Sequence, residues 1–515
     1  MRHTSTNTIL EQEQPLSQSL LWQLQRQFFA QQGINAWNHN TVPHYVTSNP
    51  FIANAYAKVV FGFLRDWQSA IDPTQPLYIL ELGAGSGRFA YHFLKQFWDF
   101  FPHSTLRHIP IKYILSDFSE SNLQYWRTHP FLQPYFQQGI LDIAHFDAQH
   151  DQSLTLHFAN QTHTSLKNPL IVLANYFFDC LPQDVFTLKQ QQLHASLVTL
   201  TLRENSEFRI QNSELHFDDP DLIHHLAVSY TDRPITPHYY ADVDYNHLLQ
   251  HYQQHLTDTT FLLPVVGLDC LRNLRRLSGD RLLFLSGDKG YSQLEDLRNR
   301  SKPHMVFHGS CFSLMVNYHA MGQYTSHQGG QALHTPHHHA SLNISAFLFG
   351  QPPTQYTETR HAYQDAIVNT SPDDFFNLKK ALDPHCDRLS LEHAIAYIRL
   401  SGYDAKIFLA CFPSFMAHAK SVFNAQRQEL IQLIHNVWET YYPIGEPEDL
   451  AFQLGKILVS LQEYYTAAKY FQQSLKFQGL QPETLDYLSQ CYHHLGETEA
   501  ALYCIHQTQL LQAIT

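Results

Sequence analysis

Charge is scarce in this chain, and its scarcity already limits what the protein binds. Only 15% of the 515 residues are Asp, Glu, Lys or Arg, and 46 acidic against 33 basic residues give a net charge of −13 with neutral histidines. Nucleic-acid binding needs a standing basic surface, so we expect no nucleic-acid partner. The sequence also has no uninterrupted apolar run near the ~18 residues of a membrane span, so no membrane segment is expected.

Paired cysteines are absent as well. The seven cysteines are an odd number and include no CxxC pair, which argues against a disulfide framework and a zinc site, so no metal is expected. The first residues hold two Glu and no apolar core of signal-peptide length, so we predict a cytoplasmic protein. The cysteines are then expected to be reduced and mostly buried: Cys180, Cys270, Cys311, Cys386, Cys411, Cys491 and Cys504.

Apolar residues and histidines, by contrast, are plentiful. The apolar share of 44%, with 13% aromatic residues, suits a packed core and excludes wholesale disorder. The 35 histidines outnumber Lys and Arg combined, yet they are scattered and show no spacing typical of a metal site. We therefore interpret their excess as composition, and we expect His337, His338 and His339 to lie in a solvated loop.

Strands and helices alternate through the first part of the chain. Apolar runs of strand length are separated by segments of helical periodicity. This order predicts a parallel sheet covered by helices on both faces. The predicted strands are 77–83, 111–119, 140–148 and 170–178, and the predicted helices include 18–33, 51–68 and 87–100.

The order of elements changes after the fourth strand. Residues 184–215 alternate and are rich in Thr and Val, which predicts antiparallel strands. We expect an inserted helical segment at 216–258, followed by a strand, a helix and a strand that ends at residue 287. A mobile loop is predicted at 326–340. A Ser-Pro-acid signature starts a helix at 371–382, beyond which everything is predicted to be helical.

The C-terminal end repeats with a period of 34 residues. Gly455 stands where two paired helices need a small residue, and Pro482 opens the second unit. This pattern resembles tetratricopeptide helix pairs, with an ordinary helical bundle of accidental spacing as the alternative. The matching positions are Leu454, Leu458, Ala467 and Phe471 in the first unit and Leu488, Tyr492, Ala501 and Ile505 in the second.

The sharpest chemical signal is the sequence LYILELGAGSGRFA at 77–90. A strand ending in Glu81 runs into Gly83, Gly85 and Gly87 and then into a helix. Glycines let the backbone pass close to a ligand, and the N-terminus of the helix offers unpaired N–H groups. A purely structural strand-to-helix turn is the alternative. A dinucleotide-dependent oxidoreductase is disfavoured, because its glycines follow G-x-G-x-x-G whereas these follow G-A-G-S-G.

Small polar residues also end the next three strands. Asp117 is placed to accept hydrogen bonds from both hydroxyls of a ribose, and Asp147 is placed to accept one from the exocyclic amine of an adenine. Asn175 ends the fourth strand at the crevice edge where open sheets bind ligands. Four polar strand ends in succession are unusual in a purely structural sheet, so the sequence predicts an adenosyl ligand.

At these positions the sequence resembles class I S-adenosylmethionine-dependent methyltransferases. Within them it resembles the MidA-like family, which includes mitochondrial complex I assembly methyltransferases acting on protein arginine. The likeness covers about residues 20–345 and implies an α/β fold, a Rossmann-like class I methyltransferase sheet with helices on both faces, followed by a C-terminal all-α tetratricopeptide-like domain. It rests on VTSNPFIANAYAKVV (46–60), ELGAGSGRFA (81–90) and ANYFFDCLP (174–182), with a weaker likeness in GSCFSLMVNYHAMGQY (309–324).

The resemblance implies S-adenosyl-L-methionine as the cofactor and gives each motif residue a role. By it, Asp117 would hold the ribose and Asp147 the adenine. Tyr176 stands where the family motif has Glu, and a phenol cannot pair with a guanidinium as a carboxylate does, so arginine as the acceptor is in question. The expected cofactor-binding residues are Glu81, Gly83, Ala84, Gly85, Gly87, Asp117 and Asp147; the expected catalytic residues are Asn175, Tyr176 and Asp179; and Thr47, Ser48 and Asn317 are expected at the substrate or lid.

The sequence thus predicts a methyltransferase that acts on a protein side chain and recruits a protein partner or substrate with its helical tail. A catalytically inactive scaffold or assembly factor and a small-molecule methyltransferase are the alternatives, and Tyr176, Phe177 and Phe178 have an alternative reading as core aromatics. The predicted domains are a helical cap at 1–75, a methyltransferase domain at 76–350 with an insertion at about 216–258, a helical connector at 351–440 and the repeats at 441–515.

Overall fold

The computed structural model divides the protein into two compact units. It describes residues 8–38, 41–203 and 219–514. Part of the predicted helical connector, residues 351–374, lies in the first unit. Unit 1 comprises residues 1–48 and 55–374, and unit 2 comprises residues 49–54 and 375–515.

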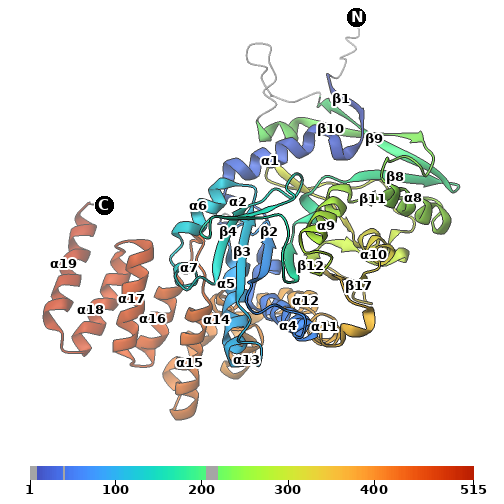
Figure 1. Ribbon diagram of the computed structural model, residues 1–515. Helices are drawn as coiled ribbons and strands as arrows, with labels where there is room; N and C mark the ends of the chain where they lie inside the picture. Colours follow the sequence, from blue (N-terminus) through green and yellow to red (C-terminus); the bar gives the residue numbers. More distant parts are fainter. Residues whose placement is uncertain (1–7, 39–40, 204–218, 515) are drawn as a thin grey trace, which may run out of the picture. The chain divides into compact units, whose positions relative to one another are not determined.

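A seven-stranded sheet forms the middle of unit 1 (Figure 1). Its strands are β2 (Leu77–Leu82), β3 (Ile111–Asp117), β4 (Leu141–His145), β7 (Leu170–Asn175), β12 (Leu282–Asp288), β17 (Gln331–Leu333) and β18 (Asn343–Phe349). They are ordered β17-β18-β12-β7-β2-β3-β4, and the five strands from β12 to β4 are parallel. The four predicted strands are therefore confirmed, and they are neighbours. Every residue of β2 is buried, which explains why this strand reads as a continuous apolar run.

The direction of chain order reverses between β2 and β7. From β2 the chain moves outward through β3 to β4, whereas from β7 it moves the other way to β12. Open α/β sheets bind their ligands in the crevice that such a reversal leaves at the carboxyl ends of the strands. The reversal therefore marks the ends of β2 and β7 as the place for a site.

Helices cover the two faces of this sheet. On one face, Leu80 and Leu82 lie in a core cluster with apolar residues of α9 (Val265–Leu277) and α10 (Tyr318–His327). On the other face, the ring of Tyr113 packs against Phe93 of α5 (Arg88–Phe100) with ring centroids 5.3 Å apart. The predicted helices at 18–33, 51–68 and 87–100 are confirmed as α1 (Leu20–Gln32), α4 (Pro50–Trp67) and α5.

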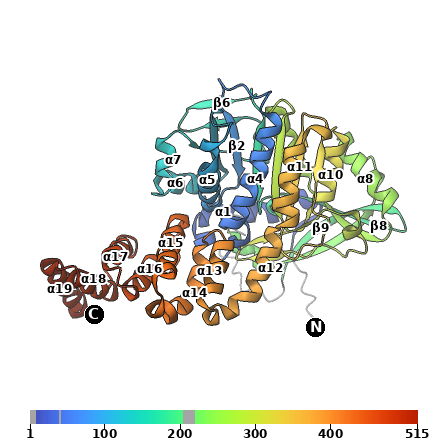
Figure 2. The ribbon, with the colours of Figure 1, turned by 90° about the horizontal axis from the view of Figure 1, so that it is seen from below.

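Helix α4 lies alongside α11 (Thr357–Tyr363), as Figure 2 shows. The carboxylate of Asp66 in α4 accepts hydrogen bonds from the backbone N–H groups of Glu358 and Thr359 at 3.0 and 2.8 Å. These N–H groups have no partner inside their own helix, so a carboxylate there stabilises its first turn. The remaining helices and short strands of unit 1 include α6 (Glu120–Thr128), α7 (Gln133–Gln137), β5 (Leu154–Leu156), β6 (Gln161–His163), β13 (Gly290–Tyr291), β14 (Val306–His308), β15 (Cys311–Ser313) and β16 (Val316–Asn317).

A second, antiparallel sheet lies in unit 1, where one prediction is wrong. Its strands are β1 (Ile9–Gln14), β8 (Asp184–Lys189), β9 (Gln192–Leu202), β10 (Leu226–Pro234) and β11 (Thr259–Leu263). The predicted strands at 184–215 are confirmed up to Leu202, while 204–215 lie outside the described residues. The helical prediction for 216–258 holds for α8 (Val243–His255) but fails at β10, because all nine residues there pair with β9. The pairing with β9, and not the local periodicity, therefore determines that this segment is a strand.

The predicted mobile loop at 326–340 is also partly wrong. Helix α10 continues to His327, and β17 pairs with β18. A ring nitrogen of His334 lies 2.9 Å from the Ser345 hydroxyl, and burial lowers the pKa of His334 to about 4. Of the three histidines predicted in a solvated loop, His338 is exposed as expected, whereas His339 lies near Asp373.

Unit 2 is entirely helical in its described part, as predicted for residues beyond 382. Its last four helices follow one another in chain order, and each packs on the next (Figure 1). A Cβ atom on Gly455 of α16 would lie 2.6 Å from the ring of Phe471 of α17, so a small residue is required where α16 and α17 meet. The tetratricopeptide assignment stays a prediction. The helices are α12 (Pro372–Leu382), α13 (Leu391–Leu400), α14 (Ala405–His418), α15 (Asn424–Thr440), α16 (Leu450–Ser460), α17 (Tyr464–Gln478), α18 (Pro482–His494) and α19 (Thr498–Ile514).

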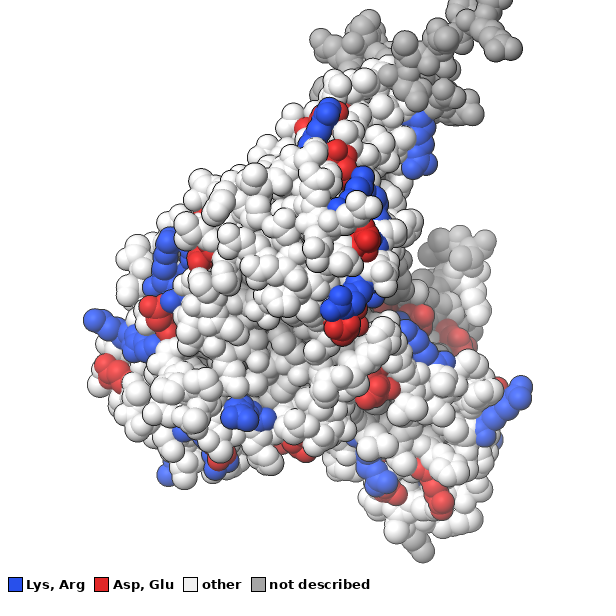
Figure 3. Space-filling model, turned by 90° about the vertical axis from the view of Figure 1, so that its right-hand side faces the viewer, with Lys and Arg blue, Asp and Glu red and all other residues white. Residues whose placement is uncertain are grey.

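The surface is sparsely charged. Figure 3 shows a face on which basic and acidic side chains form small mixed groups separated by wide uncharged areas. All seven cysteines are free and six of them are buried, so the expected burial is confirmed. Within residues 8–38, 41–203 and 219–514, no helix is long and apolar enough to cross a bilayer. Over the same residues, no three His, Cys, Asp or Glu side chains are grouped to hold a metal ion.

Candidate active site

A pocket opens at the carboxyl edge of the central sheet, beside the reversal of chain order. The turn after β2, the segment after β7, the residue after β12 and the short helix α3 (Tyr45–Ser48) all contribute to its wall. The structure thus brings together residues separated by more than a hundred positions in the chain. Nine of the predicted site residues line the pocket: Thr47, Ser48, Glu81, Gly83, Ala84, Gly85, Asn175, Tyr176 and Asp179.

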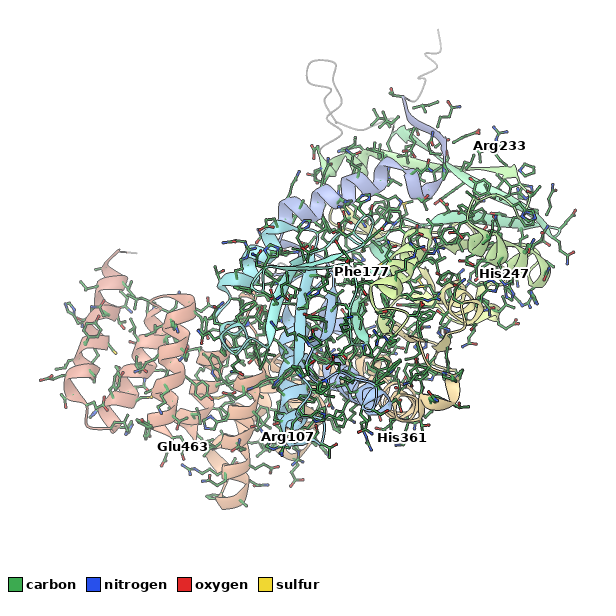
Figure 4. All side chains as sticks on the ribbon, in the orientation of Figure 1. Arg107, Phe177, Arg233, His247, His361 and Glu463 are labelled. Atoms are coloured by element: carbon green, nitrogen blue, oxygen red, sulfur yellow. The ribbon has the colours of Figure 1, made fainter. Side chains whose placement is uncertain are left out.

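The glycine-rich turn passes directly beneath two aromatic rings. Gly83 and Gly85 have φ angles of +59° and +53°, a conformation that L side chains rarely adopt. A Cβ atom on Gly83 would lie 2.8 Å from the ring of Phe177, and one on Gly85 would lie 2.9 Å from the ring of Trp37. Figure 4 labels Phe177 at this edge of the sheet. Neither position therefore has room for a side chain, and the turn reaches the pocket as bare backbone.

Glu81 is the last residue but one of β2 and lies just before the turn. Its side chain is buried, and its Oε2 accepts a hydrogen bond from the Tyr113 hydroxyl at 2.8 Å. Burial raises the pKa of Glu81 to about 8, with a smaller contribution from the nearby Asp117. Glu81 is therefore mostly protonated at neutral pH, and a cation placed beside it would stabilise the ionised carboxylate. The ammonium group of an amino acid fits this requirement.

Asp117 ends β3 as predicted, but its carboxylate does not line the pocket. It accepts hydrogen bonds from the backbone N–H groups of Gly85 (3.3 Å) and Ser119 (3.0 Å) and from the side-chain amide of Asn122 (3.1 Å). Burial raises the pKa of Asp117, and these hydrogen bonds oppose the rise. Asp117 thus ties the glycine-rich turn to the first turn of α6, which is a structural task in addition to any contact with a ribose.

Asp147, Gly87 and Asn317 also lie outside the pocket wall. Asp147 is paired with Arg26 of α1 at 2.6 Å. Gly87 precedes the first residue of α5 with a φ of 75°. Asn317 is buried at the start of α10, where its side chain accepts from the Ala320 N–H at 2.9 Å and donates to the Leu262 carbonyl at 2.8 Å. The side chain of Asn317 therefore caps a helix and joins it to β11.

Asn175 links the sheet edge to α3. Its side-chain oxygen accepts from the Tyr56 hydroxyl at 2.7 Å, and its side-chain nitrogen donates to the Thr47 carbonyl at 3.3 Å. Both ends of the amide are therefore engaged, which fixes its orientation. This link holds Thr47 and Ser48 over the pocket, where the sequence placed a lid.

Tyr176 adopts a conformation that is unusual for a bulky residue. Its φ is +47°, and its N–H donates to the Gly287 carbonyl of the neighbouring strand at 2.9 Å. Non-glycine residues with positive φ persist where the surroundings hold them, often at functional sites. The ring of Tyr176 lines the pocket, whereas Phe178 is fully buried in the core. The reading of this segment as core aromatics therefore applies to Phe178 and not to Tyr176.

A pair of buried acids stands behind Tyr176. Asp179 and Asp288 are 5% and 0% exposed, and their carboxyl groups are within hydrogen-bonding reach of each other. Burial raises the pKa of both, and the neighbouring Asp179 raises that of Asp288 further. Each ionised carboxylate disfavours ionisation of the other, so their proximity and burial favour a protonated form of the pair. Lys289 on the pocket wall favours the ionised form of Asp179.

Sequence reasoning missed Asp288. The signal was present, because the predicted strand ending at 287 is followed directly by an acid and a lysine in LSGDK. It is a fifth strand whose carboxyl end bears a polar side chain, next to β7 in the sheet. The side chain accepts from the backbone N–H groups of Phe177 and Phe178 at 3.4 and 3.2 Å, which anchors the segment that carries Tyr176.

These observations define an α/β protein with a ligand pocket at the switch point of a largely parallel sheet. Residues 61–264 match the model of a family described as "Putative S-adenosyl-L-methionine-dependent methyltransferase". That stretch contains the glycine-rich turn, Asp117, Asp147 and the segment from Asn175 to Asp179. The match confirms the predicted cofactor at the level of the family and supports the class of methyltransferases that use it.

No curated protein matches the sequence. An uncharacterized protein from Burkholderia thailandensis is 11% identical over 67% of this chain and 90% of its own, with a TM-score of 0.40. A methyltransferase candidate from the same organism, bound to S-adenosyl-homocysteine, is 14% identical over 62% of this chain and 74% of its own, with a TM-score of 0.39.

Proposed function

We propose that this protein transfers a methyl group from S-adenosyl-L-methionine to a side chain of a protein substrate. The observation that carries the proposal is the pocket itself, because the glycine-rich turn, Glu81, Tyr176 and Asp179 all line it at the switch point of the sheet. The family model that covers these residues supports the cofactor. The proposal includes two further points. The protein belongs to the MidA-like subfamily, and the group that accepts the methyl is on a protein.

The cofactor half of the pocket suits the methionine portion of that molecule. Glu81 would receive its ammonium group, and the glycine-rich turn would follow its chain closely because Gly83 and Gly85 present backbone only. The bound cofactor supplies an electrophilic methyl group. Thr47 and Ser48, held by Asn175, would close the site from α3 and exclude water.

The acceptor half has to orient a nucleophile and take its proton. Methyl transfer needs an acceptor lone pair in line with the methyl group and free of its proton. The phenol of Tyr176 stays neutral, since burial raises its pKa, so it serves as a hydrogen-bond partner. The raised pKa values of Asp179 and Asp288 favour uptake of a proton, so this pair would act as the proton acceptor.

Unit 2 would recruit the substrate. The last helix, α19, exposes Leu502, Tyr503 and Leu510 by 60%, 64% and 46% of their surface. Beyond Glu499 it carries no Asp, Glu, Lys or Arg. Helical arrays present such surfaces to protein ligands, and an apolar stripe exposed to solvent marks an interaction site. This stripe supports a protein substrate over a small molecule.

Labelling a lysate with tritiated S-adenosyl-L-methionine tests the proposal. We expect the full chain to label a discrete protein band, and we expect Leu502→Glu with Tyr503→Glu to abolish that labelling while leaving cofactor affinity unchanged. The matched control is Tyr465→Glu, an equally exposed aromatic at 63% on α17, which should label normally. Cofactor binding without any labelled protein would instead identify an inactive scaffold or a small-molecule enzyme.

A further inference from the structure

The acceptor predicted for the adenine amine is already occupied by a side chain of this protein. Arg26 of α1 donates to both carboxylate oxygens of Asp147, at 2.6 Å to Oδ2 and 3.3 Å to Oδ1. The backbone N–H of Gln149 donates to Oδ1 at 3.0 Å. A bidentate guanidinium–carboxylate pair is one of the stronger polar contacts that proteins make. An adenine amine therefore cannot reach Asp147 without displacing Arg26 from it.

Arg26 also makes the second contact that a purine would make. Its guanidinium carbon lies 4.4 Å from the centre of the Phe118 ring, over the ring face. Phe118 directly follows Asp117, the residue predicted to hold the ribose. A flat, delocalised group that stacks on an aromatic face and donates N–H groups to a carboxylate reproduces the shape and the hydrogen bonding of an adenine base.

The side chain of Arg26 has room to leave while its helix stays in place. The preceding residue, Gln25, is anchored at both ends of its amide, donating to the Cys180 carbonyl at 3.1 Å and accepting from the Phe312 N–H at 2.9 Å. A surface cavity of about 540 Å³ adjoins Arg26, with Phe118 and His150 in its wall. The Arg26 side chain is one-third exposed, so a rotamer change carries it into solvent.

We propose that Arg26 occupies the adenine subsite as an internal competitor and that cofactor binding requires it to release Asp147. This inference rests on the proposed function. The affinity for the cofactor is then reduced by the fraction of molecules in which Arg26 has swung away. It follows that Asp147 contacts the base only in molecules in which Arg26 has released it.

Calorimetric titration of the full chain with S-adenosyl-homocysteine tests this inference. We expect Arg26→Ala to bind about tenfold more tightly than the wild type, within the range usual for coupling of this kind, and Arg26→Lys to lie between them because an ammonium cannot pair bidentately. The matched control is Arg272→Ala. Arg272 pairs with Asp242 at 2.7 Å and lies over the Tyr245 ring at 5.3 Å, but it is not in the wall of either cavity. That variant should bind like the wild type.

A second ligand isolates the adenine amine. S-inosyl-homocysteine carries a carbonyl oxygen in its place, so it gains only the vacated subsite and should gain less from Arg26→Ala than S-adenosyl-homocysteine does. Asp147→Asn should remove that difference between the two ligands. Equal or weaker binding of S-adenosyl-homocysteine by Arg26→Ala overturns the inference and leaves the proposed function standing. Absence of binding to both proteins at millimolar ligand overturns the proposed function. If Arg26→Ala does not fold, Arg26→Gln gives the same comparison.

Discussion

The two ends of the proposed cofactor site differ in how far the protein has already satisfied their polar groups. At the methionine end, Glu81 receives one hydrogen bond and faces a pocket, and Gly83 and Gly85 present bare backbone. At the adenosine end, Asp117 holds three donors and Asp147 is paired with Arg26. A carboxylate at a strand end is thus a binding group only to the extent that the protein leaves it available.

The largest expected effect is at the methionine end. Gly85→Val should abolish S-adenosyl-homocysteine binding, at least a hundredfold in Kd, because the branched side chain would collide with Trp37 and force an unfavourable φ. Gly139→Val provides the control, since Gly139 has a φ of +69° with nothing within 4 Å of its Cβ position. Calorimetry decides, and equal losses in both variants would mean that backbone strain alone weakens binding.

Asp179→Asn should separate chemistry from cofactor binding. We expect methyl transfer to fall by about a hundredfold or more, in line with the loss of a proton acceptor, while the Kd for S-adenosyl-homocysteine changes less than about twofold. Asp142→Asn is the matched control, because Asp142 is equally buried but accepts its hydrogen bonds from Phe158 and Ala159 away from the pocket. Undiminished turnover in Asp179→Asn would remove the acid pair from the mechanism.

Separate substitutions of Asp117 and Glu81 compare how much the adenosine end and the methionine end of the site contribute to stability. Asp117→Ala leaves three donors without a partner and should lower the free energy of unfolding by about 2–3 kcal/mol. Glu81→Gln should cost less than about 1 kcal/mol, because a neutral amide replaces an acid that is already mostly protonated at pH 7. Urea unfolding of both variants measures the difference. Equal losses in the free energy of unfolding would show that Asp117 contributes no more to stability than Glu81 does.

The smallest expected effect is on the pH dependence of binding. The pKa of Glu81 is raised to about 8, so below that pH the group is protonated and has to lose a proton to pair with an ammonium. Affinity for S-adenosyl-homocysteine should therefore rise with pH, by at most about tenfold between pH 6.5 and 7.5. Titrations in buffers of different ionisation enthalpy should reveal the released proton. Glu81→Gln should bind with no such slope.

Much of the site was predictable because its signals are local. The turn after β2 is written in consecutive residues, and Asn175, Tyr176 and Asp179 lie within five positions of one another. Asp147 was also placed correctly on the edge of the sheet, but its partner Arg26 comes from a helix 121 residues earlier in the chain. Nothing in the residues around Asp147 indicates that pairing.

The sequence by itself determined the alternation of strands and helices, the glycine-rich turn and the class of cofactor, because hydrophobic periodicity and turn chemistry depend on near neighbours. Only the tertiary structure decided which groups are available. It set Asp288 beside Asp179, paired β10 with β9 against its predicted helical character, and laid Arg26 on Asp147. These contacts depend on strand order and on the packing of distant segments, which fix the surroundings of each side chain and hence its charge and its partners.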